Sequence, residues 1–299
     1  MSEREKVPLK VALIGANGQL AFDLSRTKPA IVEIIPLTRD DFDLRDQHLM
    51  KKFLLDIKPD IIINTAAVHK VDILEEDKSV AFEVNTIAVA NLAHICSLLG
   101  AKLVHISTDY VFSGEKFYKK EPYYEFDQPS PINIYGLSKY AGELAIKAYT
   151  SNFIIARVSS LFGVAGASGK GGNFVYTILN KAKEFEKSGE SLKVVADVFM
   201  TPTYTKDAAV VIWKLLINDE RGIFHVSNSG ICSWWEFAVE IVKLAGIDVN
   251  VDRLSSGEYP SKARRPVWSP LASARGVKMR HWKEALVDFL DEVYKMKKF

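Results

Sequence analysis

Short runs of apolar, often β-branched residues alternate with longer amphipathic stretches through the first half of the chain. This alternation is typical of βα units whose strands share one parallel sheet. It predicts strands at residues 9–14, 31–37, 61–64, 103–107 and 153–158. It predicts helices at residues 19–26, 46–57, 79–99 and 136–149. We therefore expect an α/β fold with a Rossmann-type, doubly wound parallel sheet that these strands complete by residue 158.

The alternation becomes irregular beyond residue 160, where a glycine-rich segment spans residues 163–172. Further elements are predicted at residues 173–187 (helix), 192–195 (strand), 207–217 (helix) and 223–226 (strand), followed by two terminal helices. We expect a cofactor-binding Rossmann domain over residues 1–160, completed by parts of 192–230. A smaller C-terminal α/β lobe for the substrate is expected over residues 161–299.

Composition narrows the class of protein. The 299 residues include 48% hydrophobic side chains, and 39 basic against 37 acidic residues give a formal charge of +2. Such a balance creates no field that would attract nucleic acid or an anionic membrane. Cys96 and Cys232 form neither a disulfide framework nor a metal-ligand spacing, and no apolar leader or membrane-length segment is evident. We expect a soluble, cytoplasmic protein, and the sequence leaves a homodimer open.

Histidine positions predict no metal site. The six histidines are scattered, and none shows the spacing of a metal-binding pair. We expect His69 and His105 to serve as packing or loop residues.

A candidate cofactor loop follows the first predicted strand. Its sequence is Gly15-Ala16-Asn17-Gly18-Gln19-Leu20-Ala21. A dinucleotide loop needs a tight turn at the first glycine, bare backbone at the second and a small residue where helix and strand pack. Backbone N–H groups at the helix start would then bind the phosphates. The alternative is an ordinary glycine turn, but the position within a series of βα units favours cofactor binding.

The end of the second predicted strand bears on which nicotinamide cofactor is used. The strand ends in Thr38 and Arg39, and an arginine at this point accommodates the 2′-phosphate of NADPH. Asp40 and Asp41 follow directly, which leaves NADH or dual use open, and Arg39 could also be a solvated side chain.

Tyr135 and Lys139 form a candidate proton-delivery pair. They are four residues apart at the start of a predicted helix and so share one face. We expect the Lys139 ammonium and a bound nicotinamide cation to lower the pKa of Tyr135, and Lys139 to hold the nicotinamide ribose. Thr108 follows the strand at 103–107 and would supply a second hydrogen bond at the carboxyl edge of the sheet. Tyr135 would act as a general acid toward a carbonyl that receives hydride.

These motifs carry a family resemblance over nearly the whole chain. The pieces are GANGQLA, KPDIIINTAAVHKVD, VNTIAVANLA, LVHISTDYVFSG, YGLSKYAGE, GGNF, TPT, RRPVWSPLAS and HWKEAL. Together they resemble the dTDP-4-dehydrorhamnose reductases, a branch of the extended short-chain dehydrogenases. STDYVF with YGLSK is specific to this branch.

The resemblance implies a chemistry and a set of site residues. It implies NADPH-dependent reduction of the 4-keto group of a dTDP-linked deoxysugar, dTDP-4-dehydrorhamnose to dTDP-rhamnose, for cell-surface polysaccharide precursors. By motif position, Thr108, Tyr135 and Lys139 would be catalytic. The cofactor would contact Asn64, Ala66 and Ala67, Asn85 would support the site, and the sugar nucleotide would contact Asp109, Tyr110, Asn173 and Phe174. Some members use magnesium, for which the sequence offers no carboxylate cluster.

The last lobe contains a pair of cations, Arg264 and Arg265. A diphosphate ligand would need such groups. A solvated basic loop is the equally weighted alternative.

Three departures from the family pattern concern the pocket. Ser160 stands where the family often has an aromatic residue that contacts the sugar. The glycine-rich segment at 163–172 lies beside the expected substrate site, and the apolar run 198–200 precedes Thr201-Pro202-Thr203 where the family is more polar. These departures bear on which sugar is bound.

Two other functions fit the same fold. A nucleotide-sugar dehydratase needs an Asp-Glu pair after the threonine, whereas Thr108 is followed by Asp109 and Tyr110, so elimination is disfavoured. An epimerase would recycle its cofactor without net consumption. A non-catalytic regulatory subunit, like the similar beta subunit of methionine adenosyltransferase, would retain the fold and act through protein contacts.

Overall fold

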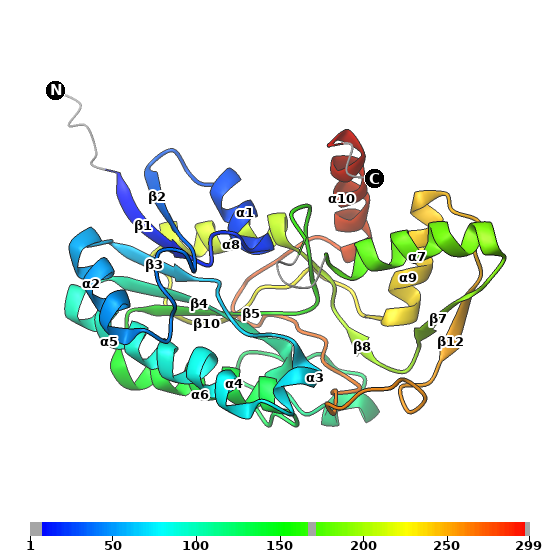
Figure 1. Ribbon diagram of the computed structural model, residues 1–299, viewed down its shortest axis with the longest axis horizontal. Coiled ribbons are helices and arrows are strands. Elements are labelled where there is room, and N and C mark those ends of the chain that lie inside the picture. Colours follow the sequence, from blue (N-terminus) through cyan, green and yellow to red (C-terminus); the bar gives the residue numbers. More distant parts are fainter. Residues whose placement is uncertain (1–7, 167–171, 297–299) are drawn as a thin grey trace.

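A six-stranded parallel sheet forms the centre of the computed structural model, which describes residues 8–166 and 172–296 (Figure 1). The strand order is β10-β5-β4-β3-β1-β2, and all neighbours run parallel. The strands are β1 (Leu9–Ile14), β2 (Val32–Leu37), β3 (Ile61–Asn64), β4 (Lys102–Thr108), β5 (Phe153–Val158) and β10 (Gly222–His225). Because the chain order reverses direction between β1 and β3, the ligand crevice of such a sheet is expected at their carboxyl ends.

Helices cover both faces of the sheet (Figure 1). One face carries α1 (Gln19–Arg26) and α8 (Thr205–Ile217), and the other carries α2 (Gln47–Ile57), α5 (Ala88–Leu99) and α6 (Ile134–Tyr149). Alternate residues of β1 enter the two cores: Val11 and Leu13 join the first, Ala12 and Ile14 the second. Burial on both faces explains why these strands read as continuous apolar runs.

The helix expected at residues 79–99 is interrupted by a π-helical turn. It runs through α4 (Lys78–Phe82), the π turn η1 (Glu83–Ile87) and α5. Such turns are rare and often occur at functional sites. By length and composition alone the stretch Lys78–Leu99 could cross a membrane. However, its buried side chains form part of the core under the sheet, so it is the core helix of an α/β domain.

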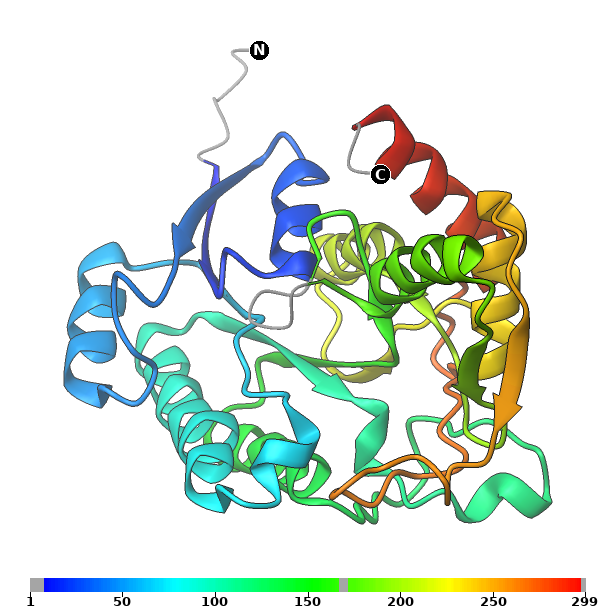
Figure 2. The ribbon, with the colours of Figure 1, turned by 45° about the vertical axis from the view of Figure 1, so that its right-hand side comes forward.

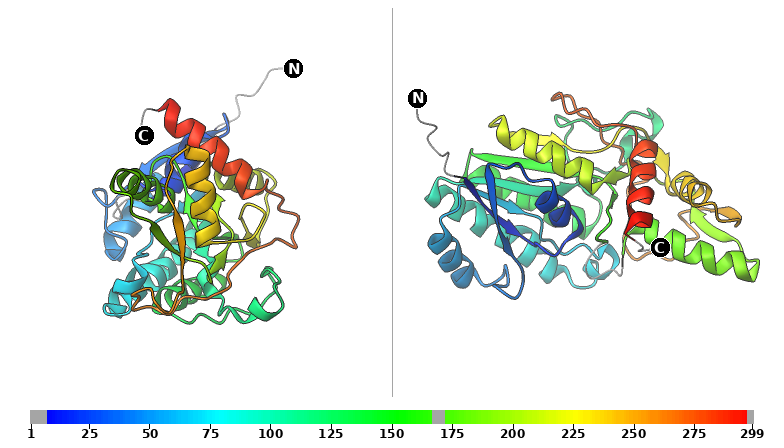
Figure 3. Two further views of the ribbon diagram at one scale, coloured as in Figure 1. Left: turned by 90° about the vertical axis from the view of Figure 1, so that its right-hand side faces the viewer. Right: turned by 90° about the horizontal axis from the view of Figure 1, so that it is seen from above.

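The second lobe has its own apolar core. It contains α7 (Phe174–Ser188), α9 (Trp234–Ala245) and α10 (Trp282–Lys295), and α10 lies beside α9 (Figure 2). The strands β7 (Leu192–Val195) and β12 (Val251–Leu254) pair in parallel next to α7 and α9, as the left view of Figure 3 shows. Remaining elements are β6 (Leu161–Phe162), β8 (Phe199–Met200), β9 (Thr203–Tyr204), β11 (Cys232–Ser233), α3 (Val71–Leu74), η2 (Asp109–Val111) and η3 (Glu115–Tyr118).

The α/β, Rossmann-type fold is confirmed, with corrections of detail. The sixth strand of the sheet is β10, which comes from beyond residue 160, so the expectation that the first half completes the sheet was wrong. Thr108 is the last residue of β4 and does not follow it. The division into two domains at residue 160 stays a prediction. Of the glycine-rich segment, Gly169 and Gly171 lie outside the described residues.

Candidate active site

The glycine turn after β1 has the geometry of a phosphate-binding loop. Gly15 has φ +77°, and a side chain there would approach the Ala66 nitrogen to 2.9 Å. A Cβ at Gly18 would lie 3.1 Å from the Gly15 carbonyl oxygen. Helix α1 starts at Gln19 without a side-chain cap, so its first N–H groups are available to an anion. Asn17 is exposed and Leu20 is buried, which leaves Leu20 only its backbone for a cofactor.

The end of β2 lies against this turn. The Gly15 and Ala16 nitrogens both donate to the Leu37 carbonyl, at 2.9 and 3.1 Å. Arg39 follows two residues later and is exposed. Thr38 donates from its backbone N–H and its hydroxyl to the Asp41 carboxylate, at 2.7 and 3.2 Å. Arg39 is therefore the group at this position that an anion can reach.

Strand β3 ends at Asn64, whose buried side-chain amide holds the backbone that follows the strand. The Asn64 side chain is fully buried, and its Oδ1 accepts from the Ala66 nitrogen at 3.1 Å. Ala66 and Ala67 are partly exposed beside the glycine turn. These residues lie at the reversal of strand order, where open parallel sheets are expected to bind their ligands.

Helix α6 brings Tyr135 to Thr108. The Asn133 side chain caps the helix by accepting from the Gly136 nitrogen at 2.8 Å. A Cβ at Gly136 would come within 2.1 Å of the Tyr110 carbonyl oxygen, so only glycine lets the helix approach η2 this closely. The Thr108 hydroxyl lies close enough to the Tyr135 phenol to lower its pKa. Two motifs that lie 27 positions apart in the sequence therefore meet at the carboxyl edge of the sheet.

The π turn supports α6 from the other side. Asn85 donates to the Ser138 hydroxyl at 3.1 Å and to the Val68 carbonyl at 3.0 Å, while its own Oδ1 accepts from the Val68 nitrogen. Ser138 in turn donates to the Tyr135 carbonyl at 2.8 Å. Asn85 therefore ties the first turn of α6 to the loop after β3, as expected of a residue that supports the site.

Lys139 lies under the site and is 2% exposed. Its Nζ donates to the Ile106 carbonyl at 2.7 Å and lies 3.0 Å from Nε2 of His105. Burial lowers the pKa of Lys139 to about 7, against the opposing effect of Glu143 one turn further along α6. The ammonium is thus easily discharged near neutral pH.

Tyr135 behaves differently from the sequence-based expectation. Burial raises its pKa to about 12, with a smaller rise from Asp109 and a lowering by the Thr108 hydroxyl. Lys139 is not among the groups that shift the Tyr135 pKa, so the expected lowering by its ammonium is wrong, while the expected effect of a bound nicotinamide cation stays a prediction. A raised pKa keeps Tyr135 protonated, which is the form that a proton donor requires.

Asp109 is buried beneath Thr108. Its Oδ1 accepts from the Thr108 hydroxyl at 3.1 Å, and its Oδ2 accepts from Ser159 at 3.0 Å and from Ser269 at 2.5 Å. Burial raises its pKa to about 6, although the three hydroxyls oppose this. In this structure Asp109 orients Thr108, and its expected contact with the sugar stays a prediction.

Tyr110, Arg264 and Arg265 lie near the first turn of α6. The Tyr110 ring meets Tyr135 edge-on, with centroids 6.0 Å apart. Arg265 forms a two-pronged ion pair with Asp72, at 2.6 Å for the closer contact, and lies near Tyr110. Arg264 is exposed, and its carbonyl accepts from Asn133. Arg264 is therefore the more accessible of the two cations, and both roles stay predictions.

Asn173 and Phe174 begin the second lobe beside the cofactor loop. Asn173 donates to the Gly163 carbonyl at 2.9 Å and to Gln19 Oε1 at 3.5 Å, and it caps α7. Phe174 packs against Trp234 and Phe237, with centroid separations of 4.5 and 5.7 Å. Asn173 thus links the two halves of the chain, while Phe174 contributes to the core of the lobe.

Sequence reasoning missed two buried charged residues next to the site, Glu143 and Arg157, and it took the buried His105 for a packing or loop residue. Arg157 forms a two-pronged ion pair with Glu143, at 2.7 and 2.9 Å, and Ser107 donates to the same carboxylate at 2.5 Å. The signal was present, since His105 and Arg157 interrupt otherwise apolar strands and Glu143 follows Lys139 by one helical turn. Charged residues inside a buried strand are rarely without partners.

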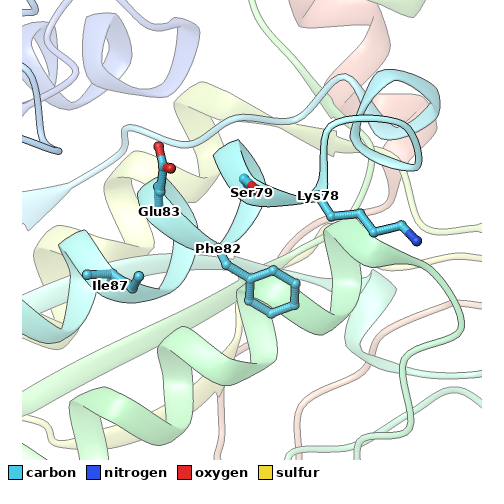
Figure 4. A pocket seen from close by; sticks show the side chains of 5 residues that line it. All are labelled: Lys78, Ser79, Phe82, Glu83 and Ile87. Atoms are coloured by element: carbon cyan, nitrogen blue, oxygen red, sulfur yellow. The ribbon is translucent and has the colours of Figure 1, made fainter.

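A surface hollow lies away from this site. Lys78, Ser79, Phe82, Glu83 and Ile87 line it, all on the helix that runs from α4 through η1 (Figure 4). None of these residues belongs to the edge of the sheet described above. Within residues 8–166 and 172–296, no group of three or more His, Cys, Asp or Glu side chains could hold a metal ion.

Comparisons with known proteins show which family the chain is similar to. Residues 9–295 match the RmlD substrate binding domain family. The spore coat polysaccharide biosynthesis protein SpsK of Bacillus subtilis (strain 168) is 39% identical over 288 residues, which cover 95% of this chain and 97% of that protein. The dTDP-4-dehydrorhamnose reductase of Sinorhizobium fredii is 36% identical over 293 residues, covering 93% and 95%.

Two solved structures are similar to this chain over most of its length. The crystal structure of a dTDP-4-dehydrorhamnose reductase from Clostridium acetobutylicum has a TM-score of 0.88 and 40% identity, and it covers 95% of this chain and 99% of that one. The chain belongs to the dTDP-4-dehydrorhamnose reductase family. The structure of such a reductase from Bacillus anthracis in complex with NADP has a TM-score of 0.87 and 39% identity over the same shares.

Membership of the dTDP-4-dehydrorhamnose reductase family confirms the resemblance and makes the chain an NAD(P)H-dependent oxidoreductase. Two departures from the family pattern are visible in the structure. Ser160 adopts a left-handed backbone with φ +45°, unusual for a residue other than glycine. Phe199 packs against Trp268 at a centroid separation of 5.3 Å, which places that apolar run in a small aromatic cluster.

Proposed function

We propose that the protein uses NADPH to reduce the 4-keto group of a dTDP-linked deoxysugar, with dTDP-4-dehydrorhamnose as substrate and dTDP-rhamnose as product. The carrying observation is that α6 brings the Tyr135 phenol next to the Thr108 hydroxyl at the carboxyl end of β4, with Lys139 one helical turn beyond. The names of the relatives support the choice of sugar. A cytoplasmic location and a role in polysaccharide precursor synthesis are part of this proposal.

In this mechanism the chain supplies the proton and the orientation. When bound, NADPH would be the source of the hydride that the carbonyl carbon receives. Tyr135 donates its hydroxyl proton to the carbonyl oxygen as negative charge develops there, and Thr108 holds that oxygen with its hydroxyl. Lys139 positions the ribose beside them. In the structure the single O–H of Thr108 donates to Asp109 at 3.1 Å, so Thr108 would turn this O–H from Asp109 to the carbonyl oxygen of the substrate.

The remaining contacts follow from charge. The turn from Gly15 to Gly18 and the start of α1 would hold the cofactor diphosphate, and Arg39 would bind the 2′-phosphate. Arg264, the exposed cation near the first turn of α6, would bind the diphosphate of the sugar nucleotide. Tyr110, whose ring meets Tyr135 edge-on, would line the sugar site.

The test is NADPH oxidation by the full chain against a panel of 4-keto sugars linked to dTDP, GDP or UDP. We expect stoichiometric NADPH consumption with the dTDP-linked sugar and much slower consumption with the others. Turnover without net NADPH consumption would favour an epimerase. No oxidation with any member of the panel, together with recovery of a synthetase in a pull-down, would favour a regulatory subunit.

A further inference from the structure

His105 lies between two groups of the candidate active site. Its Nε2 is 3.0 Å from Nζ of Lys139, and its Nδ1 is 3.2 Å from Nδ2 of Asn64. His105 stands on β4, directly beside Asn64 on β3 in the register of the sheet, while Lys139 reaches it from α6. The imidazole is 0% exposed. The imidazole of His105 therefore fills the space between Asn64, on the side of the expected cofactor, and Lys139.

The hydrogen positions of this trio are mutually constrained. A neutral imidazole has one N–H and one acceptor nitrogen. Asn64 presents its NH₂ group to Nδ1, because its oxygen already accepts from the Ala66 nitrogen at 3.1 Å. Nδ1 is then the acceptor, and Nε2 carries the proton. That proton points at Lys139, which can accept it only as a neutral amine, since an ammonium has no lone pair.

Protonation of Lys139 requires the opposite arrangement. The ammonium donates to Nε2, so the ring proton moves to Nδ1. Asn64 must then turn its amide over and present its oxygen to the ring. This turn removes the acceptor from the Ala66 N–H and leaves that N–H for an acceptor on the cofactor side. The charge on Lys139 and the hydrogen bonding at Ala66 are therefore linked through one ring.

We propose that His105 is a positioning residue. By changing its tautomer it couples the protonation of Lys139 to the hydrogen bonding of the Ala66 N–H, which lies beside the expected cofactor. The inference rests on the proposed function, in which Lys139 stands beside Tyr135 and Ala66 beside the cofactor. His105 does not carry protons to solvent, because the ring is fully buried and both nitrogens have protein partners.

The surrounding groups allow this exchange. Burial lowers the pKa of His105 well below its usual value, so the ring stays neutral. Lys139 titrates in the neutral range, with Tyr135 one turn before it and Glu143 one turn after it on α6. The Glu143 carboxylate is bound by Arg157 of β5.

The other neighbours on the sheet add little charge. The residue beside His105 on β5 is the apolar Ile155, and Asn64 on β3 is uncharged. Asp109, with a pKa raised to about 6, follows the end of β4. The group that titrates in contact with the ring near pH 7 is therefore Lys139.

The direct test is a nitrogen-15 NMR titration of the full chain labelled at histidine, without ligands, from about pH 5.5 to 9, a range that brackets the titration of an ordinary histidine. His105→Gln assigns the signal, and His48→Gln, at an exposed position of α2, is the control. We expect the His105 ring to stay neutral and to change from the Nδ1–H to the Nε2–H form as pH rises through about 7. A single tautomer throughout, or a ring that becomes an imidazolium, would overturn the proposal.

A second measurement separates positioning from mere packing. A glutamine at 105 has no tautomers, and its carbonyl accepts from the Lys139 ammonium at any pH. We expect His105→Gln to move the alkaline limb of the kcat/KM profile upward by about one pH unit, while the Kd for NADPH changes less than about threefold, which is under 1 kcal/mol. His48→Gln should leave both unchanged.

The two proposals can fail separately. Lower activity of His105→Gln with an unmoved alkaline limb would contradict the coupling. If the wild-type protein oxidises no NADPH with any 4-keto sugar, the proposed function fails, and the NMR titration still decides the coupling.

Discussion

Arg157 and Glu143 form a buried ion pair that lies one helical turn from Lys139. The two side chains are 1% and 0% exposed, and two N–H groups of the guanidinium bind the two carboxylate oxygens at 2.9 and 2.7 Å. The pair joins β5 to α6, the helix that carries Tyr135 and Lys139. Because Arg157 neutralises Glu143, the Glu143 carboxylate does not draw Lys139 away from Ile106 and His105.

Removing one partner of this pair should destabilise the fold. Arg157→Met leaves the Glu143 carboxylate buried without its cation, and we expect the free energy of unfolding to fall by about 3–5 kcal/mol. Urea unfolding followed by circular dichroism measures this. Arg45→Met, which breaks an exposed pair with Asp43, should cost less than about 1 kcal/mol. Equal losses in the two variants would contradict the view that burial makes the Arg157 pair important.

Asp109 should make stability depend on pH. Its pKa is raised to about 6 in the folded protein, against about 3.9 when unfolded. A raised pKa means that the folded state holds the proton more tightly, so this contribution to stability is complete below about pH 4 and lost as pH rises through 6. Asp109→Asn removes the ionisation, and its unfolding free energy relative to wild type should rise by on the order of 2–3 kcal/mol between pH 4 and 7.5.

Asp43 provides the opposite control. Arg45 lowers the pKa of Asp43 to about 2, so this carboxylate stabilises the fold above about pH 4, and the contribution is lost as pH falls through 2. Asp43→Asn should therefore lose a little stability at neutral pH, by less than about 1 kcal/mol because the pair is exposed. A flat difference between Asp109→Asn and wild type from pH 4 to 7.5 would show that folding does not raise the pKa of Asp109.

The contrast between these groups shows where sequence reasoning ends. The spacing of Tyr135 and Lys139 was enough to place both on one helical face, and the strand before Thr108 was enough to put it at the carboxyl edge. The sign of the pKa shift at Tyr135 was not accessible, because it depends on how much of the phenol is buried by segments distant in the chain.

The sequence also did not reveal which strands pair or which side chains meet across the fold. The apolar run at residues 223–226 was read as a strand, but nothing local indicates that β10 joins β5 at the edge of the sheet. The π turn at Glu83–Ile87 shifts hydrogen bonding by one residue within a pattern that still reads as helix. His105 was visible as a polar residue in a strand, but its partner on α6 depends on how that helix packs.

Gly136 should be required for the approach of α6 to the site. A Cβ at this position would meet the Tyr110 carbonyl oxygen at 2.1 Å, so Gly136→Ala must push Tyr135 away from Thr108. We expect kcat to fall by about 10²-fold, with NADPH affinity nearly unchanged. Gly257→Ala, where the nearest atom is 3.7 Å away, is the matched control and should behave as wild type. A Gly136→Ala enzyme with the kcat of wild type would contradict the close approach of helix and η2.

Arg39 should determine the cofactor preference. Arg39→Ala removes the cation that would bind the 2′-phosphate, a charge-assisted interaction of about 1.5–3 kcal/mol. We expect kcat/KM for NADPH to fall about 10- to 100-fold, while that for NADH changes little. Arg45→Ala, a nearby exposed arginine that binds Asp43, should alter neither value. Equal losses for both cofactors would place the 2′-phosphate elsewhere.

Tyr135→Phe tests the central claim most directly, because it removes one hydroxyl and keeps the ring. In the proposed mechanism this hydroxyl acts when charge develops on the carbonyl oxygen, so its loss should lower kcat by about 10²- to 10⁴-fold. The Kd for NADPH, measured by fluorescence titration, should change less than about twofold. A Tyr135→Phe enzyme that oxidises NADPH with the dTDP-linked 4-keto sugar at the wild-type kcat would contradict the assignment of Tyr135 as the proton donor.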